Sequence, residues 1–183
     1  MAKTTGPLFS MDASGKFGGA LVFGKWKGRN VVRQLVTPAN PQSANQEASR
    51  NAVRCFGEAQ RQMNLSTEVH TGDTLTDKEL FTAAAPSGQA WNGYLVKSGI
   101  GANQIHYDAA AAAYAALTAP QKAAWVAGAD ALVPAILGVA QTAAGGVPAA
   151  SLTSGEVFFH KCYARYVAGL DLAAPGVAPP DYS

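Results

Sequence analysis

Apolar residues gather in two short runs near the start of the chain, at 17–23 and 31–36. Both runs are rich in β-branched or aromatic side chains, and a polar segment containing Gly28 separates them. This pattern is typical of a β-hairpin. The first run is apolar on both faces of the expected strand, so it needs cover on both sides. We therefore expect the rest of the chain, or a neighbouring subunit, to cover it.

A long amphipathic helix is expected after the proline break at 38–41, from about Ser43 to Met63. Alanine, phenylalanine and methionine recur there every three or four positions, which predicts one buried stripe. Arg50, Arg54 and Arg61 fall close together off that stripe. Glu58 lies one turn from Arg54 and Arg61, so this basic ridge is partly paired, and its simplest interpretation is a solvated helix face.

Shorter helices are expected over the rest of the chain. The sequence signals are a Thr76–Glu79 capping box, an amphipathic segment at 91–95, an Asn103 cap before an alanine-rich run, a start at Ala119-Pro120, and a Thr153–Glu156 capping box. We expect the last helix to end at 174–176, before an extended tail. The predicted fold class is α+β, with an N-terminal arm and basic hairpin (1–41), a helical domain (42–174) and an extended tail (175–183).

Composition excludes several protein classes. The chain has 183 residues and is 48% hydrophobic and 14% charged, which argues against intrinsic disorder. Two cysteines are too few for a disulfide-built mini-protein, so we interpret Cys55 and Cys162 as free thiols made in a reducing cytoplasm. The N-terminus does not resemble a signal peptide.

Charge is divided unevenly along the chain. Residues 1–64 carry nine cations and three anions (9 − 3 = +6), and the remainder carries five cations and nine anions (5 − 9 = −4). The net charge of +2 therefore conceals a basic front and an acidic back, a pattern that indicates an interaction surface.

The uncharged stretch between Asp130 and Glu156 is long enough to cross a bilayer. It contains prolines, glycines and many alanines, which contribute little transfer energy. We favour a buried helix followed by a loop, with a membrane span as the alternative.

Candidate catalytic chemistry is sparse. His70, His106 and His160 lie in different segments, and the chain has no zinc-type cysteine pairs, HExxH, GxSxG, P-loop or GxGxxG motif. We therefore expect no enzymatic activity, no metal, no cofactor and no small-molecule substrate.

The basic turn at 25–29, with Arg33 behind it, is the most informative feature. Cations around an indole can bind phosphates and stack on a base, can contact an acidic protein surface, or can form a solvated turn. We favour protein contact. The candidate partner-binding residues are Phe17, Leu21, Phe23, Lys25, Trp26, Lys27, Arg29 and Arg33.

The front of the chain resembles a family of small proteins encoded in tailed bacteriophages and prophages. The resemblance lies in residues 6–10 (GPLFS), 14–19 (SGKFGG), 24–33 (GKWKGRNVVR), 38–43 (PANPQS) and, more weakly, 118–125 (TAPQKAAW). It implies a virion structural component made in the host bacterial cytoplasm, whose partners are other virion proteins and copies of itself. It supplies no catalytic residues.

The resemblance and the sequence pattern together leave three hypotheses. The first is a head, neck or tail protein that cements or adapts neighbouring subunits, with the N-terminal arm, the hairpin and the proline-rich tail ordering against those neighbours. The second is a DNA-binding or packaging accessory protein that uses the basic front. The third, weaker hypothesis is a membrane-active lysis protein that uses residues 131–150.

Overall fold

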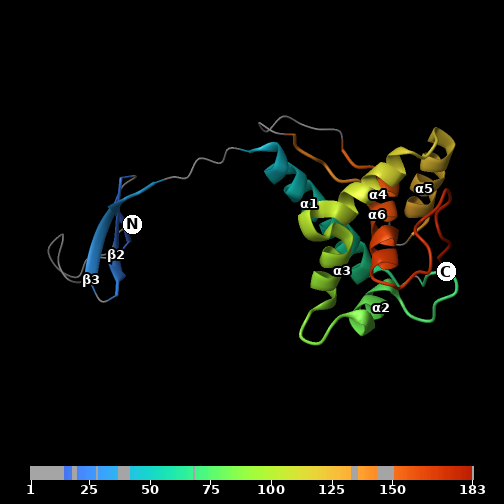
Figure 1. The fold of residues 1–183 in the computed structure, drawn as a ribbon, viewed down its shortest axis with the longest axis horizontal. Helices are drawn as coiled ribbons and strands as arrows, with labels where there is room; N and C mark the ends of the chain where they lie inside the picture. Colours follow the sequence, from blue (N-terminus) through green and yellow to red (C-terminus); the bar gives the residue numbers. More distant parts are fainter. Residues whose placement is uncertain are drawn as a thin grey trace. The chain divides into compact units, whose positions relative to one another are not determined.

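A computed structural model describes residues 15–17, 20–27, 29–36, 42–67, 69–132, 136–143 and 151–182, with only the backbone at 15–17, 25, 29 and 30. The chain divides into two compact units, Met1–Pro41 and Gln42–Ser183. The first contains a β-sheet and the second is built from helices (Figure 1). The α+β fold class expected from the sequence is confirmed.

The N-terminal sheet has three antiparallel strands: β1 (Gly15–Phe17), β2 (Leu21–Trp26) and β3 (Arg29–Gln34). Their order is β1-β2-β3, so β2 lies in the middle. The tight turn between β2 and β3 includes Lys27, whose φ of 48° lies in the left-handed region. The predicted hairpin is therefore present as β2 and β3.

The single strand expected at 17–23 is wrong. Phe17 pairs directly with Leu21, so the chain reverses between them and this region contributes to two strands. Gly18 and Gly19 lie outside the described residues. A glycine pair readily permits a tight reversal, and the apolar pattern alone did not reveal it.

The second unit contains six α-helices and one 3-10 helix among the described residues. They are α1 (Ala44–Leu65), α2 (Asp77–Ala84), α3 (Trp91–Ile100), η1 (Ala102–Gln104), α4 (Ile105–Ala115), α5 (Ala119–Ala131) and α6 (Ser154–Val167). Helix α6 packs against α1, α3, α4 and α5 (Figure 1).

The core surrounds α6 because this helix has buried residues on all sides, from Val157 to Arg165. On one side, Phe158 and Phe159 pack edge-to-face on Trp125 of α5. On another side, Ala164 joins the cluster that contains Phe56 and Phe81. A helix buried all round lies at the centre of its unit.

Three helix starts, those of α2, α5 and α6, follow the predicted signals. At α2, the Thr76 hydroxyl accepts from the N–H of Glu79, and the Glu79 carboxylate accepts from the N–H of Thr76 at 2.9 Å. Helix α5 begins with Pro120 in its first turn, as expected. At α6, Thr153 accepts from the N–H of Glu156 at 3.2 Å, which is one of the two bonds of the expected capping box.

Two predicted helix boundaries are wrong. Asn103 does not cap α4: it lies in η1 with a φ of 52°, and Gln104 precedes the helix without a side-chain capping bond. The last helix ends at Val167 and not at 174–176. Gly169, with a φ of 74°, adopts the left-handed conformation that commonly terminates helices.

The C-terminal segment packs on the helical unit, so the expectation that it orders against neighbouring subunits is wrong. The N–H of Thr71 donates to the carbonyl of Asp181 at 2.8 Å, and the Tyr182 ring lies 5.8 Å from that of Phe158. Pro179 approaches Gly128 so closely that a Cβ there would lie 2.8 Å from its ring. The proline-rich composition produced an extended segment that still finds cover within its own chain.

The helix expected after Asp130 is also wrong within the described residues. Helix α5 ends at Ala131, residues 136–143 are non-helical, and Val139 forms an antiparallel bridge with Leu152. Among the residues that the structure describes, no helix is both long and apolar enough to span a bilayer.

Candidate docking surface and buried polar cluster

One face of the N-terminal sheet carries a hollow of about 500 Å³. Residues paired across an antiparallel ladder share a face, and Val22 pairs with Arg33 as Gly24 pairs with Val31. Trp26 lies two positions beyond Gly24 and therefore on the same face. We call these five residues, which line the hollow, the groove face.

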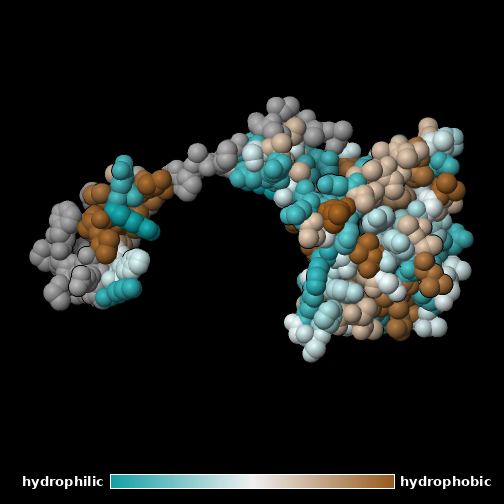
Figure 2. Space-filling view, viewed as in Figure 1, coloured by the Kyte–Doolittle hydropathy of each residue, from teal (hydrophilic) through white to brown (hydrophobic). Residues whose placement is uncertain are grey.

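Gly24 forms the open centre of the groove face. A Cβ atom built on this residue would have no atom of the described residues within 4 Å. The absence of a side chain at this position therefore leaves room for a group from outside the sheet. Figure 2 shows apolar residues, in brown, gathered on this unit beside hydrophilic ones.

Large apolar side chains on this sheet are exposed to solvent. Trp26 is 60% exposed, Val31 is 40% exposed and Val36, just beyond β3, is 73% exposed. The ammonium group of Lys27 lies 6.0 Å from the centroid of the Trp26 ring, and Arg33 is also exposed. Clustered apolar residues rimmed by charge are typical of protein contact sites.

The structure locates five of the predicted partner-binding side chains. Trp26, Lys27 and Arg33 are exposed, Leu21 is partly buried, and Phe23 is buried at 4% exposure. Phe23 alternates with the groove-face residues and so belongs to the opposite face of β2. The side chains of Phe17, Lys25 and Arg29 lie outside the described part of the chain.

Three groove-face residues were missed by the sequence reasoning: Val22, Gly24 and Val31. A short turn between Trp26 and Arg29 fixes the register of β2 and β3. Pairing the strands outward from that turn would have shown that these three residues share a face with Trp26 and Arg33.

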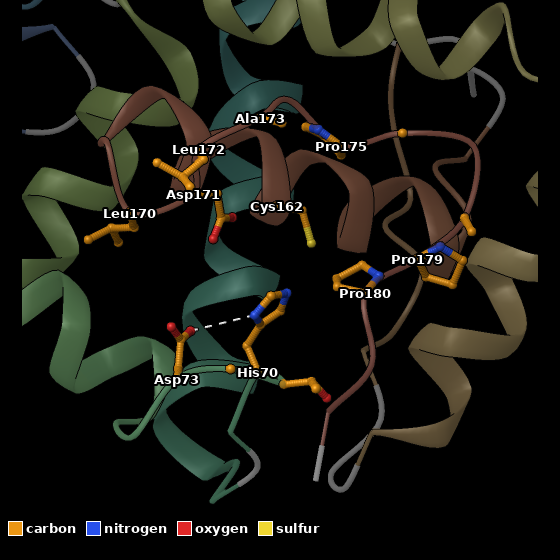
Figure 3. A pocket seen from close by; sticks show the side chains of 14 residues that line it. His70, Asp73, Cys162, Leu170, Asp171, Leu172, Ala173, Pro175, Pro179 and Pro180 are labelled. Carbon is orange, nitrogen blue, oxygen red and sulfur yellow. Dashed lines mark ion pairs between the residues drawn. The ribbon is translucent and has the colours of Figure 1, made fainter.

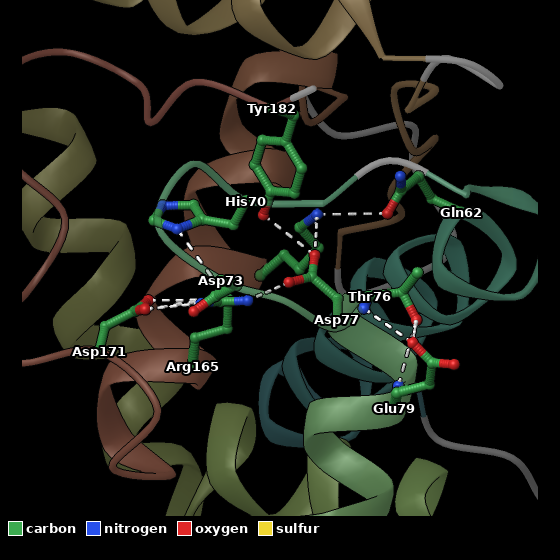
Figure 4. A network of polar contacts seen from close by, with 10 residues as sticks. Gln62, His70, Asp73, Thr76, Asp77, Glu79, Arg165, Asp171 and Tyr182 are labelled. Carbon is green, nitrogen blue, oxygen red and sulfur yellow. Dashed lines mark hydrogen bonds and ion pairs between the residues drawn. The ribbon is translucent and has the colours of Figure 1, made fainter.

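The helical unit contains a buried polar cluster centred on Asp77 (Figure 4). The Nζ atom of Lys161 lies 2.6 Å from one Asp77 oxygen and 3.3 Å from Oε1 of Gln62. The Tyr182 hydroxyl donates to the same Asp77 oxygen at 3.0 Å. Lys161 also lies 4.5 Å from the Tyr182 ring centroid, a cation–π distance.

Arg165 completes the cluster on the next turn of α6. Its guanidinium contacts Asp77, lies 2.7 Å from Oδ2 of Asp73, and lies 2.8 Å from Oδ1 of Asp171. Two buried cations thus face three carboxylates, and the cluster joins α2, α6 and the segments at 70–73 and 170–182. Buried charges need this degree of pairing.

The cluster keeps its charges because its members compensate one another. Burial would raise the pKa of Asp77, but the charges of Lys161 and Arg165 and the hydrogen bond from Tyr182 hold that pKa below its ordinary value. Burial, together with the nearby Asp77 charge, raises the pKa of Tyr182 well above its usual range. The carboxylate is therefore ionised and the phenol neutral at neutral pH, an arrangement that stabilises structure.

A pocket of about 420 Å³ lies beside this cluster, between residues 70–73 and 170–180 (Figure 3). In it, Nδ1 of His70 lies 3.6 Å from Oδ2 of Asp73. Cys162 reaches the pocket wall, but burial raises the pKa of its thiol to about 12. A neutral thiol is a poor nucleophile, and the Asp73 and Asp171 carboxylates already pair with Arg165. These contacts do not assemble a catalytic group.

His160 is a second buried polar residue whose chemistry is structural. Its ring stacks on Tyr107 at 4.4 Å between centroids and meets Phe56 edge-to-face. Both ring nitrogens lack a hydrogen-bond partner among the described residues. Burial lowers the pKa of His160 to about 4, so the ring is neutral at neutral pH.

The basic ridge of α1 is paired in part as expected: Glu58 pairs with Arg61, whereas Arg54 has other partners. Arg61 binds Glu58, and Arg54 donates to Asn51 and to the hydroxyl of Thr142. Arg50 pairs with Glu47. These contacts hold the segment around Thr142 against α1.

No cluster of three potential metal ligands occurs within the described ranges. Comparison of the chain with protein-family models, with curated proteins and with solved structures finds no match.

Proposed function

We propose that this chain is a non-enzymatic bacteriophage virion structural protein that cements or adapts neighbouring head, neck or tail subunits through its N-terminal sheet. The observation that carries the proposal is the groove face, where Trp26 and Val31 are exposed around the open position at Gly24. The resemblance of residues 6–43 to the small tailed-phage proteins supplies the virion context.

The uncovered apolar side chains of the sheet favour a docking role. Although the sheet has three strands, large apolar residues remain exposed on its groove face, as is typical of contact sites. Trp26 is 60% exposed, and aromatic side chains of this kind are frequent anchors of protein interfaces. Contact with a neighbouring subunit would bury the indole and stabilise the sheet together with the interface.

The charge of the two units points to the kind of surface that would accept the sheet. Unit Met1–Pro41 has six cations and one anion (6 − 1 = +5), and unit Gln42–Ser183 has eight cations and eleven anions (8 − 11 = −3). Complementary charge steers association and disfavours wrong partners. The partner surface should therefore be apolar at its centre and acidic at its rim.

The test is the composition of purified particles assembled with variant chains. Wild-type protein should be present in fixed stoichiometry after washing. Val31→Lys should lower incorporation by about tenfold or more, because it places a charge in the contact. The matched control is Val53→Lys, which alters an exposed valine on α1 (57% exposed, against 40% for Val31) and should leave incorporation unchanged. Absence of the wild-type protein from washed particles would contradict the proposal.

DNA binding is the second candidate function, and the +5 charge of the sheet unit is the observation that favours it. Replacing Lys25, Lys27 and Arg29 by glutamine should then reduce the slope of log affinity against log salt by about 0.9 for each lost phosphate contact. No measurable binding of duplex DNA by the full chain at low salt would exclude it.

A further inference from the structure

The two long edges of the N-terminal sheet differ. Strand β1 covers one side of β2 and has three residues, whereas β3 has six residues and no strand beyond it among those described. An edge strand presents unpaired backbone groups to solvent. The outer edge of β3 is therefore the longer free edge.

One hydrogen bond fixes which backbone groups point outward. The N–H of Leu35 donates to the carbonyl of Ala20 at 2.7 Å, so the backbone groups of Leu35 point toward β2. In an antiparallel ladder, the direction of these groups alternates from residue to residue. The N–H and C=O groups of Asn30, Val32 and Gln34 therefore point outward. Three residues with two groups each provide six positions for hydrogen bonds.

We propose that this edge of β3 is a strand-addition site, which takes an extended segment of a partner protein with apolar residues at alternate positions and a carboxylate opposite Arg33. The proposal deepens the proposed function, on which it rests, by naming the contact and the chemistry of the partner segment. Strand addition supplies affinity through backbone hydrogen bonds and specificity through alternate side chains.

The groove face explains the side-chain pattern. Because Val32 forms outward hydrogen bonds, Val31 and Arg33 occupy the non-hydrogen-bonded positions of the new ladder. Opposing side chains approach each other more closely at such positions. An added strand would therefore place one side chain opposite Val31, beside the hollow over Gly24. The next side chain on the same face of that strand would lie opposite Arg33.

The positive charge of the N-terminal unit favours a segment of a partner protein, and disfavours a second copy of β3, as the added strand. Self-pairing would bring together two units that each carry a charge of +5. Charged residues on edge strands are a recognised means of preventing edge-to-edge pairing of identical chains. A carboxylate opposite Arg33 instead forms a cross-strand pair of opposite charge.

The experiment measures binding of blocked synthetic peptides to the full-length protein by calorimetry. The acidic peptide is Val-Thr-Glu-Thr-Val-Thr-Val. In antiparallel orientation, its third residue, Glu, lies opposite Arg33 and its fifth residue, Val, lies opposite Val31. The control peptide has Lys in place of Glu. We expect the acidic peptide to bind, and the Lys peptide to bind about tenfold more weakly.

Two protein variants separate strand addition from simple surface contact. Val32→Pro removes one outward N–H without touching the β2–β3 ladder, and should weaken binding of the acidic peptide by about tenfold. Val32→Thr keeps that N–H and should leave binding nearly unchanged. Hydrogen exchange at the Leu35 amide, which bonds to Ala20, reports whether the sheet is intact in both variants. If the proline disturbs the sheet, the peptide is altered instead. N-methylation of its fourth residue, the Thr opposite Val32, removes the hydrogen bond that this Thr would donate to the Val32 carbonyl.

The outcomes distinguish this inference from the proposed function. No binding of the acidic peptide at about millimolar concentration, or equal binding by intact Val32→Pro and Val32→Thr proteins, would overturn strand addition. Incorporation into particles is measured separately, so the proposed function survives that result. Peptide binding by a protein absent from washed particles would instead sustain the strand-addition site and overturn the virion role.

Discussion

The Nζ atom of Lys161 lies 2.6 Å from Oδ2 of Asp77, and the two residues are 84 positions apart in the sequence. The Lys161 side chain is wholly buried. This ion pair joins the middle of α6 to the first turn of α2, so the helical unit closes around a charged contact within its apolar core. Removing only one partner of such a pair strongly destabilises the fold, because it leaves a buried charge unpaired.

Asp77→Asn should therefore lower the free energy of unfolding by about 3–5 kcal/mol, since it removes the charge that Lys161 and Arg165 share. The substitution keeps the size of the side chain, which leaves packing unchanged. Urea denaturation followed by circular dichroism measures the effect.

Asp108→Asn is the control for the loss of a carboxylate charge, because Asp108 is exposed on α4. We expect it to change stability by at most about 0.5 kcal/mol. If Asp77→Asn were as mild as this control, the cluster would not contribute to stability in the manner described.

Local signals in the sequence predicted local structure. The two members of the Thr76–Glu79 capping box are three positions apart and were identified from the sequence, as was the apolar stripe of α1. The Asp77–Lys161 contact was not predicted, because no spacing rule relates residues on separate helices. One signal was present: Lys161 and Arg165 lie one turn apart on a helix with many apolar residues, and buried cations need carboxylate partners.

Only part of the candidate site was predicted, because local signals reveal residues near the turn and do not reveal contacts between strands. Trp26 and Lys27 at the turn, and Arg33 further along β3, were identified from the cluster of cations around an indole. The hollow over Gly24 depends on the register of two strands, and a glycine in a strand gives no signal of what faces it.

Gly99 should not tolerate a methyl group. A Cβ there would lie 2.0 Å from Cζ of Phe56, which is fully buried. Gly99→Ala should destabilise the helical unit by about 1–3 kcal/mol through overpacking. The matched control is Gly57→Ala on α1, where a Cβ meets no atom of the described part of the chain within 4 Å and the gain in helix propensity should stabilise by about 0.5–1 kcal/mol. Thermal denaturation of both variants should give shifts of opposite sign, and shifts of the same sign would refute the close contact.

Lys27→Asn should stabilise the N-terminal sheet. Lys27 has a φ of 48° in the tight turn between β2 and β3, a conformation that asparagine adopts more readily than lysine. The Leu35 amide, which bonds across the sheet to Ala20, should exchange roughly two- to fivefold more slowly. Lys27→Ala removes the same charge but keeps the unfavourable conformation, so its exchange should not slow. Equal slowing in both variants would assign the effect to charge.

His160 should make the stability of the helical unit depend on pH. Its pKa falls from an ordinary value of 6.5 to about 4 on burial. Between these values the unfolded chain binds a proton that the folded chain does not, so stability falls as pH decreases from about 6.5 to about 4 and this loss is complete below that. The full effect is about 3 kcal/mol.

His160→Phe isolates this contribution, because phenylalanine retains an aromatic ring that can stack on Tyr107 and cannot be protonated. Urea denaturation of both proteins at several pH values gives the difference in unfolding free energy, in which the other titrating groups cancel. This difference should change in favour of the variant by about 3 kcal/mol as pH falls from about 7 to about 4. A difference that stays constant across that range would show that His160 accepts a proton equally well in the folded and unfolded chain, and would contradict its burial as a neutral ring.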